Sequence, residues 1–199
     1  MKTIQQTEHR KFAYYMQQAL QPISKRYYYS LYVNELPLKP TDKILEICSG
    51  VGDMAELLAK KVSKGQLICI DISDKYLNVS RNNLKSYPNA TLRNGHLANL
   101  HLKRNSFDVV NMHFVLHDIP KESREVIVNE MFELLRPGGK VYIREPLRDE
   151  RKISSLEIKT IFTEAGFYPL FHEENKMRFV GESITACYAK VSTMRFFLT

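Results

Sequence analysis

The feature that most constrains this chain is a stretch in which an apolar run passes through a glycine turn into a helical pattern. The run covers residues 43–47, the turn holds Gly50 and Gly52, and the amphipathic pattern covers residues 54–62. Glycines allow a tight turn and a close approach of backbone to ligand, and the following helix N-terminus offers unpaired N–H groups. The stretch therefore predicts a strand, a ligand-binding turn and a helix.

A carboxylate inside the apolar run narrows the choice of ligand. By itself, the turn from Gly50 to Ala55 also fits the G-x-G-x-x-A fingerprint of dinucleotide-binding proteins. Glu46, however, lies four residues before Gly50 in an otherwise apolar strand, where an unpaired charge costs roughly several kcal/mol. At the C-terminal end of that strand, the carboxylate is placed to face a bound ammonium group.

A second acid follows the next apolar run. Residues 65–71 predict a strand that ends in Asp71, 25 positions after Glu46. Nucleotide-binding βαβ units place an acid about 20 residues after the glycine turn, beside the ribose. A carboxylate can accept hydrogen bonds from both hydroxyls of the ribose diol. A helix N-cap role is the alternative for Asp71, but Ser73 or Asp74 already serves the following helix. We therefore assign Asp71 to a ribose.

These residues resemble the first motif of the class I S-adenosylmethionine-dependent methyltransferases, which reads acidic-x-Gly-x-Gly-x-Gly. Glu46, Gly50 and Gly52 match the motif, and Cys48 stands where the family usually has its first glycine. The stretch LLRPGGKVYI, residues 134–143, is the other specific match. The resemblance implies an α/β, Rossmann-like fold with a seven-stranded, mostly parallel sheet, an antiparallel last strand and an N-terminal helical lid.

The resemblance also implies S-adenosylmethionine as the cofactor. Glu46 would hold its methionine ammonium group, the turn of residues 48–52 would leave room for the methionine half, and Asp71 would bind the ribose diol. The candidate cofactor-binding residues are Glu46, Cys48, Ser49, Gly50, Gly52, Asp71, Ile72, His96, Leu97 and His113.

The adenine and the methionine end would be contacted by residues farther along the chain. By resemblance, Ile72 and Leu97 would sandwich the adenine, and His113 would supply its backbone near the methionine end. His96 stands where the family usually has an aspartate that accepts from the adenine amino group. An imidazole nitrogen or a backbone group would have to replace that acceptor.

The candidate catalytic residues are His117 and Glu145. His117 lies just beyond the strand predicted for residues 106–113, at the edge where parallel α/β sheets hold ligands. The segment LHDIP, residues 116–120, resembles the LHDW segment of small-molecule O-methyltransferases, whose histidine is the general base. Glu145 falls where those enzymes carry an acid that orients the base. An imidazole titrates near neutral pH and can take the proton of an attacking hydroxyl; a histidine that only packs or caps is the alternative.

A metal site is another interpretation of this region. His113 and His117 have the i, i+4 spacing that brings two imidazoles to one face of a helix. No third ligand is apparent in the sequence, and His113 should end a strand, so we expect no metal. The cysteines Cys48, Cys69 and Cys187 lie in apolar runs without C-x-x-C spacing, and we interpret them as buried thiols.

The first 40 residues precede the predicted fold. We divide the chain into an N-terminal helical segment (1–40) and a methyltransferase domain (41–199). Helical spacing between Phe12 and Leu20, and an aromatic run after Pro22, predict two helices. These rings either pack against the core or form a lid that closes over cofactor and substrate and excludes water from a sulfonium.

Composition fits one cytoplasmic domain without membrane insertion. The 199 residues are 44% hydrophobic, and the sequence has neither an apolar run of about 18 residues nor a signal-peptide core. A net charge of +7 would suit nucleic acid, but the lysines and arginines are scattered, without a block of five or more. We expect a solvated basic surface and no stable nucleic-acid partner.

We therefore expect methyl transfer from S-adenosylmethionine to a small-molecule acceptor, at a hydroxyl or similar nucleophile, by a monomer or homodimer. An RNA or protein methyltransferase is one alternative, although the Asn/Asp-Pro-Pro-aromatic motif for exocyclic amines is absent. A non-catalytic protein that binds the cofactor is another alternative. A nicotinamide dehydrogenase is disfavoured by Glu46 and by the sequence Pro137-Gly138-Gly139.

Overall fold

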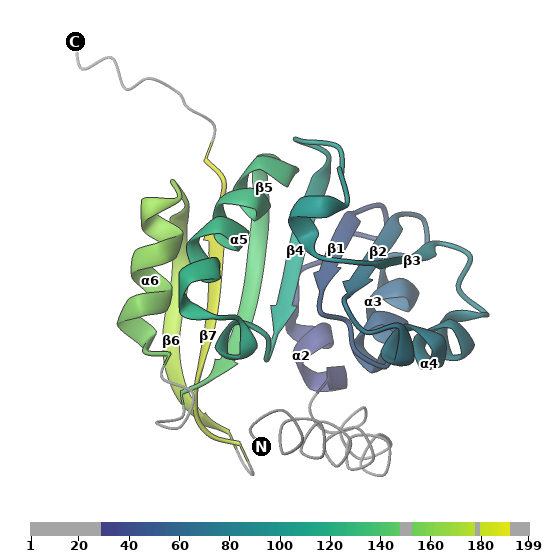
Figure 1. The fold of residues 1–199 in the computed structure, drawn as a ribbon, viewed down its shortest axis with the longest axis horizontal. Coiled ribbons are helices and arrows are strands. Elements are labelled where there is room, and N and C mark those ends of the chain that lie inside the picture. Colours follow the sequence, from purple (N-terminus) through teal and green to yellow (C-terminus); the bar gives the residue numbers. More distant parts are fainter. Residues whose placement is uncertain (1–28, 148–152, 178–179, 192–199) are drawn as a thin grey trace, which may run out of the picture.

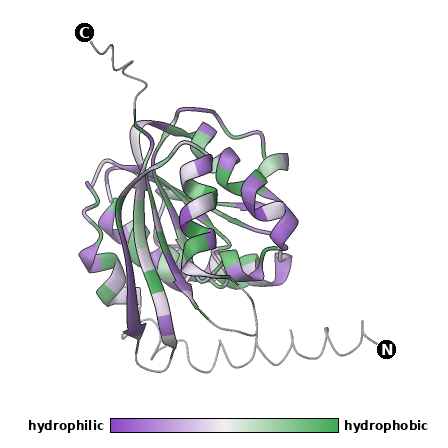
Figure 2. Ribbon diagram, turned by 90° about the vertical axis from the view of Figure 1, so that its left-hand side faces the viewer, coloured by the Kyte–Doolittle hydropathy of each residue, from purple (hydrophilic) through white to green (hydrophobic). Residues whose placement is uncertain are grey.

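The computed structural model describes residues 29–147, 153–177 and 180–191, which form a central sheet with helices on both faces (Figures 1 and 2). None of the described helices is long and apolar enough to span a membrane. The helices predicted before Tyr29 lie outside the described residues, so the lid stays a prediction.

The elements are α2 (Ser30–Glu35), β1 (Lys43–Ile47), α3 (Asp53–Lys61), β2 (Gln66–Asp71), α4 (Asp74–Leu84), β3 (Ala90–Asn94), the 3-10 helix η2 (Leu97–Asn99), β4 (Phe107–His113), the 3-10 helix η3 (Leu116–Asp118), α5 (Lys121–Leu134), β5 (Leu135–Pro146), α6 (Ser155–Glu164), β6 (Tyr168–Met177) and β7 (Gly181–Ala189).

The sheet has seven strands in the order β3-β2-β1-β4-β5-β7-β6. The pairs among β1 to β5 are parallel, whereas β7 runs antiparallel between β5 and β6. The strand order reverses between β1 and β4, and ligands of open α/β sheets bind at such switch points, beyond the carboxyl ends of the strands. The predicted fold class, with its antiparallel last strand, is confirmed.

Two hydrophobic cores fill the two faces of the sheet. Val141 and Ile143 of β5 belong to the core under α5 and α6, with Val128. Tyr142, between them, belongs to the core under α2, α3 and α4, with Tyr32. Successive side chains of a strand point to opposite faces, so the alternation in β5 divides its residues between the two cores.

The helix α2 is held over the sheet by a lysine of α3. Tyr29, next to α2, contacts the ring of His113 at the end of β4. The terminal carbonyls of a helix lack partners within the helix, and a lysine can cap them. Lys61 Nζ donates to three backbone carbonyl oxygens at the end of α2, at 2.6, 3.0 and 2.5 Å: those of Val33, Asn34 and Leu36.

The segment LLRPGGKVYI, which resembles the methyltransferases, lies almost wholly in β5. This strand begins at Leu135, directly after α5. The Pro-Gly-Gly segment stays in the sheet because Gly138 N donates to Lys190 O at 2.7 Å and Gly139 O accepts from Lys190 N at 2.9 Å. β6 likewise runs on to Met177, where it pairs with the start of β7.

Candidate active site

The turn between β1 and α3 is built from left-handed backbone. Cys48, Gly50 and Gly52 have φ angles of 54°, 57° and 86°. Glycine adopts this region readily. Gly52 also lacks room for a side chain, because an added Cβ would lie 2.4 Å from Ser80 Oγ of α4. Both backbone conformation and packing therefore require glycine at position 52.

Asp71 joins the turn to the end of β2. Its Oδ2 accepts a hydrogen bond from Gly50 N at 2.8 Å, and its Oδ1 accepts one from Ser73 N at 2.9 Å. Ser73 itself caps α4, as the sequence indicated. A carboxylate offers about four lone-pair positions. The buried Asp71 therefore supports the turn and still has acceptor capacity for hydroxyl groups of a ligand.

Glu46 is a buried carboxyl group whose negative charge receives little stabilisation from the described residues. Its side chain is 4% exposed, and Cys69 Sγ donates to Oε2 over 3.4 Å. Burial raises the pKa of Glu46 to about 8, with smaller contributions from the charges of Asp71 and Asp53. A cation bound beside Glu46 would lower this pKa again. The site thus contains a carboxyl group that favours a cationic ligand.

Cys48 begins the glycine turn, with a φ angle of 54°. The prediction of buried thiols is correct for Cys69 and Cys187 but wrong for Cys48, which is exposed because it follows the last residue of β1 and enters the turn. Desolvation by the surrounding turn, and then four carboxylates, raise the pKa of its thiol to about 12. The carboxylates come from β1, β2, η3 and β5: Glu46, Asp71, Asp118 and Glu145.

The structure brings together the two candidate catalytic residues. His117 Nδ1 in η3 lies 2.7 Å from Glu145 Oε2 in β5. Glu145 is fully buried, and its Oε1 accepts hydrogen bonds from Val115 N and Leu116 N, each at 2.6 Å. One buried carboxylate therefore fixes both the loop after β4 and the orientation of the imidazole.

The second ring nitrogen of His117 faces Asp118. Nε2 lies 3.5 Å from Asp118 Oδ2, and the two side chains are 9% and 64% exposed. Because Nδ1 is engaged by the buried Glu145, Nε2 is the nitrogen available to exchange a proton with a ligand. Asp118 is largely in solvent, so a ligand can compete with it for Nε2.

His113 lies apart from this pair, at the end of β4. The ring centroids of Tyr29 and Tyr32 are 5.3 and 5.0 Å from its own. Burial, and then the charge of Arg144, lower the pKa of His113 to about 3. The imidazole is therefore neutral at physiological pH.

The helical spacing that suggested a metal site does not apply to His113 and His117. The first residue ends a strand and the second lies in a 3-10 helix. Within the described ranges, no group of three or more His, Cys, Asp or Glu side chains is arranged to hold a metal ion.

The other predicted cofactor residues follow the ends of β1, β2 and β3. Ile72 is 51% exposed, next to Asp71, and Leu97 is buried in the core under α5. His96 is exposed at the start of η2. Ser49 is buried, and its Oγ has no hydrogen-bond partner among the residues that the structure describes.

Asp53 is a site residue that the sequence reasoning missed. It is the first residue of α3 and is 3% exposed. Burial, followed by the charges of Asp53 and Glu46, raises the pKa of Tyr29 to about 12. The sequence signal that could have identified Asp53 is an acid at the first position of a helix, directly after the glycine turn. Glu46 and Asp53 together make this end of the site acidic.

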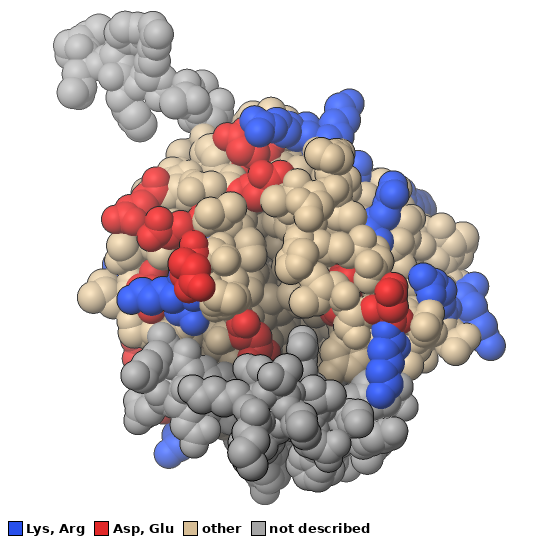
Figure 3. Space-filling model, in the orientation of Figure 1, with Lys and Arg blue, Asp and Glu red and all other residues tan. Residues whose placement is uncertain are grey.

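The basic residues do not gather into one patch on the face seen in Figure 3, where basic and acidic side chains are interspersed. At the surface, two ion pairs bring opposite charges together: Arg104 with Glu133 at 3.1 Å and Arg136 with Asp108 at 2.5 Å. The net charge of +7 therefore does not by itself mark a nucleic-acid site.

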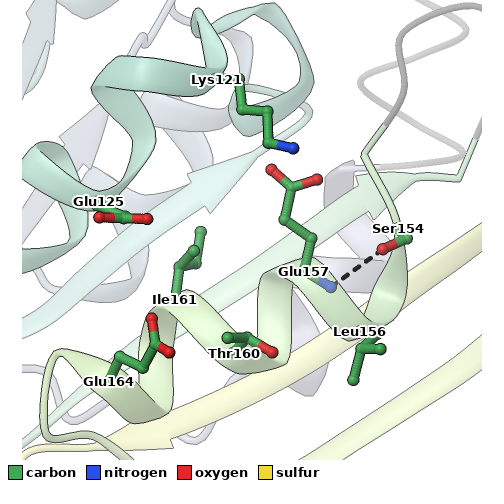
Figure 4. A pocket seen from close by; sticks show the side chains of 8 residues that line it. All are labelled: Lys121, Glu125, Ser154, Leu156, Glu157, Thr160, Ile161 and Glu164. Carbon is green, nitrogen blue, oxygen red and sulfur yellow. Dashed lines mark hydrogen bonds between the residues drawn. The ribbon is translucent and has the colours of Figure 1, made fainter.

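A separate groove of about 380 Å³ lies between α5 and α6 (Figure 4). Its polar lining includes Glu125, Glu157 and Glu164, and Glu157 is paired with Arg124 at 2.7 Å. None of the predicted site residues lines this groove. It is therefore distinct from the site at the ends of the parallel strands.

Comparison with known proteins agrees with this geometry. A family model described as a methyltransferase domain matches residues 44–139. A demethylmenaquinone methyltransferase of Staphylococcus aureus (strain MRSA252) is 36% identical over 104 residues, which are 52% of this chain and 42% of that protein. The chain thus spans less than half the length of that relative.

Solved structures show the same fold at low sequence identity. A SAM-dependent methyltransferase from Aquifex aeolicus is 20% identical, with a TM-score of 0.72 over 84% of this chain and 92% of that one. The N-methyltransferase NodS from Bradyrhizobium japonicum WM9, in complex with S-adenosyl-L-homocysteine, is 16% identical, with a TM-score of 0.70 over 82% and 84% of the two chains.

The strand order and the glycine turn at the switch point define a Rossmann-like, class I methyltransferase fold. The family model matches residues 44–139 as a methyltransferase domain, and the Aquifex aeolicus structure with this fold is that of a SAM-dependent methyltransferase. The domain match and the fold both agree with the expected class.

Proposed function

We propose that this protein binds S-adenosylmethionine where β1 and β2 end, and transfers its methyl group to a small-molecule acceptor. The observation that carries the proposal is the glycine turn after the buried Glu46 of β1, which Asp71 of β2 holds by accepting a hydrogen bond from Gly50 N at 2.8 Å. Glu46 and Asp71 suit the ammonium group and the ribose of the cofactor. Glu145 and Asp118 flank the histidine of η3.

The residues present fit this cofactor. Glu46 has a pKa of about 8 and favours a cationic partner, which the methionine ammonium group supplies. Asp71 has acceptor capacity left for a diol. The half-exposed Ile72 and the exposed His96 are in place to contact an adenine, together with Leu97. The S-adenosyl-L-homocysteine complex of NodS supports a ligand of the same class.

His117 would serve as the general base. S-adenosylmethionine, when bound, supplies an electrophilic methyl group. An acceptor hydroxyl must lose its proton as it attacks, and Nε2 of His117 takes this proton. Glu145 holds Nδ1–H at 2.7 Å, and its negative charge stabilises the imidazolium that forms. Asp118, largely exposed, then lies beside the proton on its way to solvent.

The acceptor class is supported by the relatives. The Staphylococcus aureus relative is named a demethylmenaquinone methyltransferase, so we propose a small aromatic acceptor such as a phenol or quinone precursor. A hydroxyl as the methylated group follows from the candidate base. A monomer or homodimer in the cytoplasm remains part of this proposal.

A non-catalytic S-adenosylmethionine-binding protein is the second candidate. It is favoured by one observation, the contact of His117 Nε2 with Asp118. In that case the histidine would only hold η3 in place, and its substitution would change the stability of the protein but no turnover.

Methyl transfer from cofactor with an isotopically labelled methyl group tests the proposal. The native protein should label at least one member of a panel of phenols, thiols and quinone precursors. His117→Ala should lower that rate by about 100-fold or more, the usual contribution of a general base. His101→Asn, at an exposed histidine with φ 45° that asparagine tolerates, is the matched control and should keep the full rate. Binding of cofactor without labelling of any acceptor would favour the second candidate.

A further inference from the structure

Arg144 of β5 carries a largely buried guanidinium without a close carboxylate partner among the described residues. Its side chain is 12% exposed, and Glu35 Oε2 lies 3.8 Å from its Nη2. The side chain of Glu35 is 73% exposed, so this ion pair is weak. Nε donates to the neutral Thr185 Oγ1 at 3.2 Å, and the guanidinium lies over the Tyr32 ring at 4.3 Å. Since buried charges are normally paired with an opposite charge, Arg144 has capacity for an anionic ligand.

Arg144 lies beside His113 near the carboxyl ends of the parallel strands. The two residues are opposite each other in the pairing of β4 with β5. The ring of Tyr32, in α2, contacts both of them, because its centroid lies 5.0 Å from that of His113 and 4.3 Å from the guanidinium. The next residue along β5, Glu145, holds the imidazole of the proposed base, His117. Arg144 is therefore one residue from the group that orients this base, at the edge of the sheet where α/β proteins bind ligands.

The imidazole of His113 adds an unsatisfied polar atom to the same place. Its buried Nε2 has no hydrogen-bond partner among the described residues. Burial, and then the charge of Arg144, lower the pKa of this imidazole, so it is neutral and brings no charge of its own. Buried polar atoms are rarely left unpaired. A polar ligand beside Arg144 would therefore satisfy both residues.

The charges around Arg144 favour an anion over a cation. The guanidinium disfavours positive charge nearby, as the lowered pKa of His113 indicates. Toward the proposed cofactor, by contrast, the buried acids Asp53 and Asp71 lie at the starts of the first two helices that follow parallel strands. A ligand with one negatively charged end would be repelled from that side and attracted to Arg144. A carboxylate suits this position, because a guanidinium can donate two parallel hydrogen bonds to it.

We propose that Arg144 is a specificity-determining residue that binds a carboxylate group of the methyl acceptor. This inference rests on the proposed function and narrows its acceptor class to a phenol or quinone precursor that carries a carboxylate. The carboxylate displaces the exposed Glu35 from the guanidinium, and a polar group of the acceptor reaches Nε2 of His113. Arg144 then holds one end of the acceptor while His117 faces its hydroxyl.

Binding of matched acceptors to the full chain saturated with S-adenosylhomocysteine tests this contact. The probes are para-hydroxybenzoate, salicylate and a hydroxynaphthoate, each beside the amide in which the carboxylate is neutral. For at least one pair, the native protein should bind the carboxylate about tenfold or more tightly than the amide. Arg144→Gln should lose this preference and keep its affinity for S-adenosylhomocysteine. Arg104→Gln, at an arginine that precedes β4 and is 67% exposed, is the matched control and should behave as the native protein.

Other results would overturn the proposal. Native protein that prefers no carboxylate to its amide would overturn it while leaving cofactor binding, and so the proposed function, intact. Weaker binding of S-adenosylhomocysteine by Arg144→Gln would overturn it as well, because the guanidinium would then serve the cofactor. If Arg144→Gln fails to fold, Glu35→Gln decides: it removes the competing carboxylate and should raise the preference about two- to fivefold, and an unchanged preference would contradict the proposal. Failure of the native protein to bind S-adenosylhomocysteine would contradict the proposed function itself.

Discussion

Two buried glutamates lie at the same edge of the sheet, Glu46 in β1 and Glu145 in β5. Their hydrogen-bonding environments are opposite. Glu145 accepts two backbone hydrogen bonds of 2.6 Å and holds His117 at 2.7 Å. Glu46 is almost as buried but receives one hydrogen bond, from a thiol, and its pKa is raised to about 8.

The difference separates a carboxylate that organises the protein from one that is set to bind a ligand. Glu145 is satisfied by the protein alone, so its charge is used to fix a loop and an imidazole. The negative charge of Glu46 is balanced only when a cationic ligand binds, because no basic side chain pairs with it within the described residues. The β5 side therefore prepares the base, and the β1 side prepares the cofactor pocket.

The largest effect is expected for Glu145→Ala. It leaves two buried N–H groups and the imidazole without their partner, so the free energy of unfolding should fall by about 3–5 kcal/mol. Denaturant unfolding measures this, with the exposed Glu173→Ala as the control, expected within about 0.5 kcal/mol of the native protein. An unchanged unfolding midpoint for Glu145→Ala would contradict the claim that Glu145, unlike Glu46, stabilises the protein through its hydrogen bonds.

Glu46→Gln should weaken cofactor binding by about tenfold or more without a comparable loss of stability, because the protein gives this carboxyl group little compensation. In the native protein, affinity for S-adenosylmethionine should rise with pH up to about 8, as Glu46 ionises, and then level off. Titrations across this range check the trend, which Glu46→Gln should flatten. A native affinity that is independent of pH would contradict the assignment.

The same pKa has a consequence for the protein without ligand. The folded pKa of about 8 lies above the unfolded value of 4.5, so the folded state holds the extra proton between them. The contribution of Glu46 to stability is therefore complete below pH 4.5 and is lost as pH rises through about 8. The native protein should lose stability relative to Glu46→Gln over that window, in thermal or denaturant unfolding. A constant difference between the two proteins would argue against a raised pKa.

Gly52→Ala tests the turn that follows Glu46. The added Cβ meets Ser80 Oγ at 2.4 Å and the φ of 86° strains alanine, so stability should fall by about 2 kcal/mol. Adding Ser80→Ala removes this Oγ, so it should relieve most of the clash and leave the backbone strain of about 1 kcal/mol. If Gly52→Ala unfolds like the native protein, the inference that the turn packs closely on α4 is wrong.

Cys48→Gly should have the smallest effect. Glycine removes the strain of a left-handed cysteine at φ 54° but gains freedom in the unfolded chain, so the net stabilisation is about 1 kcal/mol or less. Thermal unfolding measures it, with Cys187→Ala, a buried cysteine, as the contrasting destabilised variant. Loss of stability in Cys48→Gly would mean that the thiol contributes packing to the turn.

The fold was largely predictable because its signals are local. The apolar run with its glycine turn, the helix after that turn, and the strand that ends in Asp71 each depend on residues that are near one another in the sequence. The pairing of His117 with Glu145 was also anticipated, by resemblance to O-methyltransferases that carry an acid which orients the catalytic histidine. What these residues do in the reaction stays a prediction.

Features that depend on packing between distant segments could not be predicted. The exposure of Cys48 follows from where β1 ends, and a cysteine in an apolar sequence gives no sign of it. The contact of Tyr29 with His113 depends on how Lys61 anchors α2. The length of β5 depends on hydrogen bonds to Lys190, far along the chain.

A calorimetric titration of the full chain with S-adenosylmethionine, beside Asp71→Ala, tests the central claim most directly. The account expects micromolar binding by the native protein and a loss of about tenfold or more in the variant, since a carboxylate that accepts from the ribose diol would be removed. Far-UV circular dichroism of both proteins controls for folding. Absence of binding by a folded native protein would contradict the account and leave only the fold of a methyltransferase.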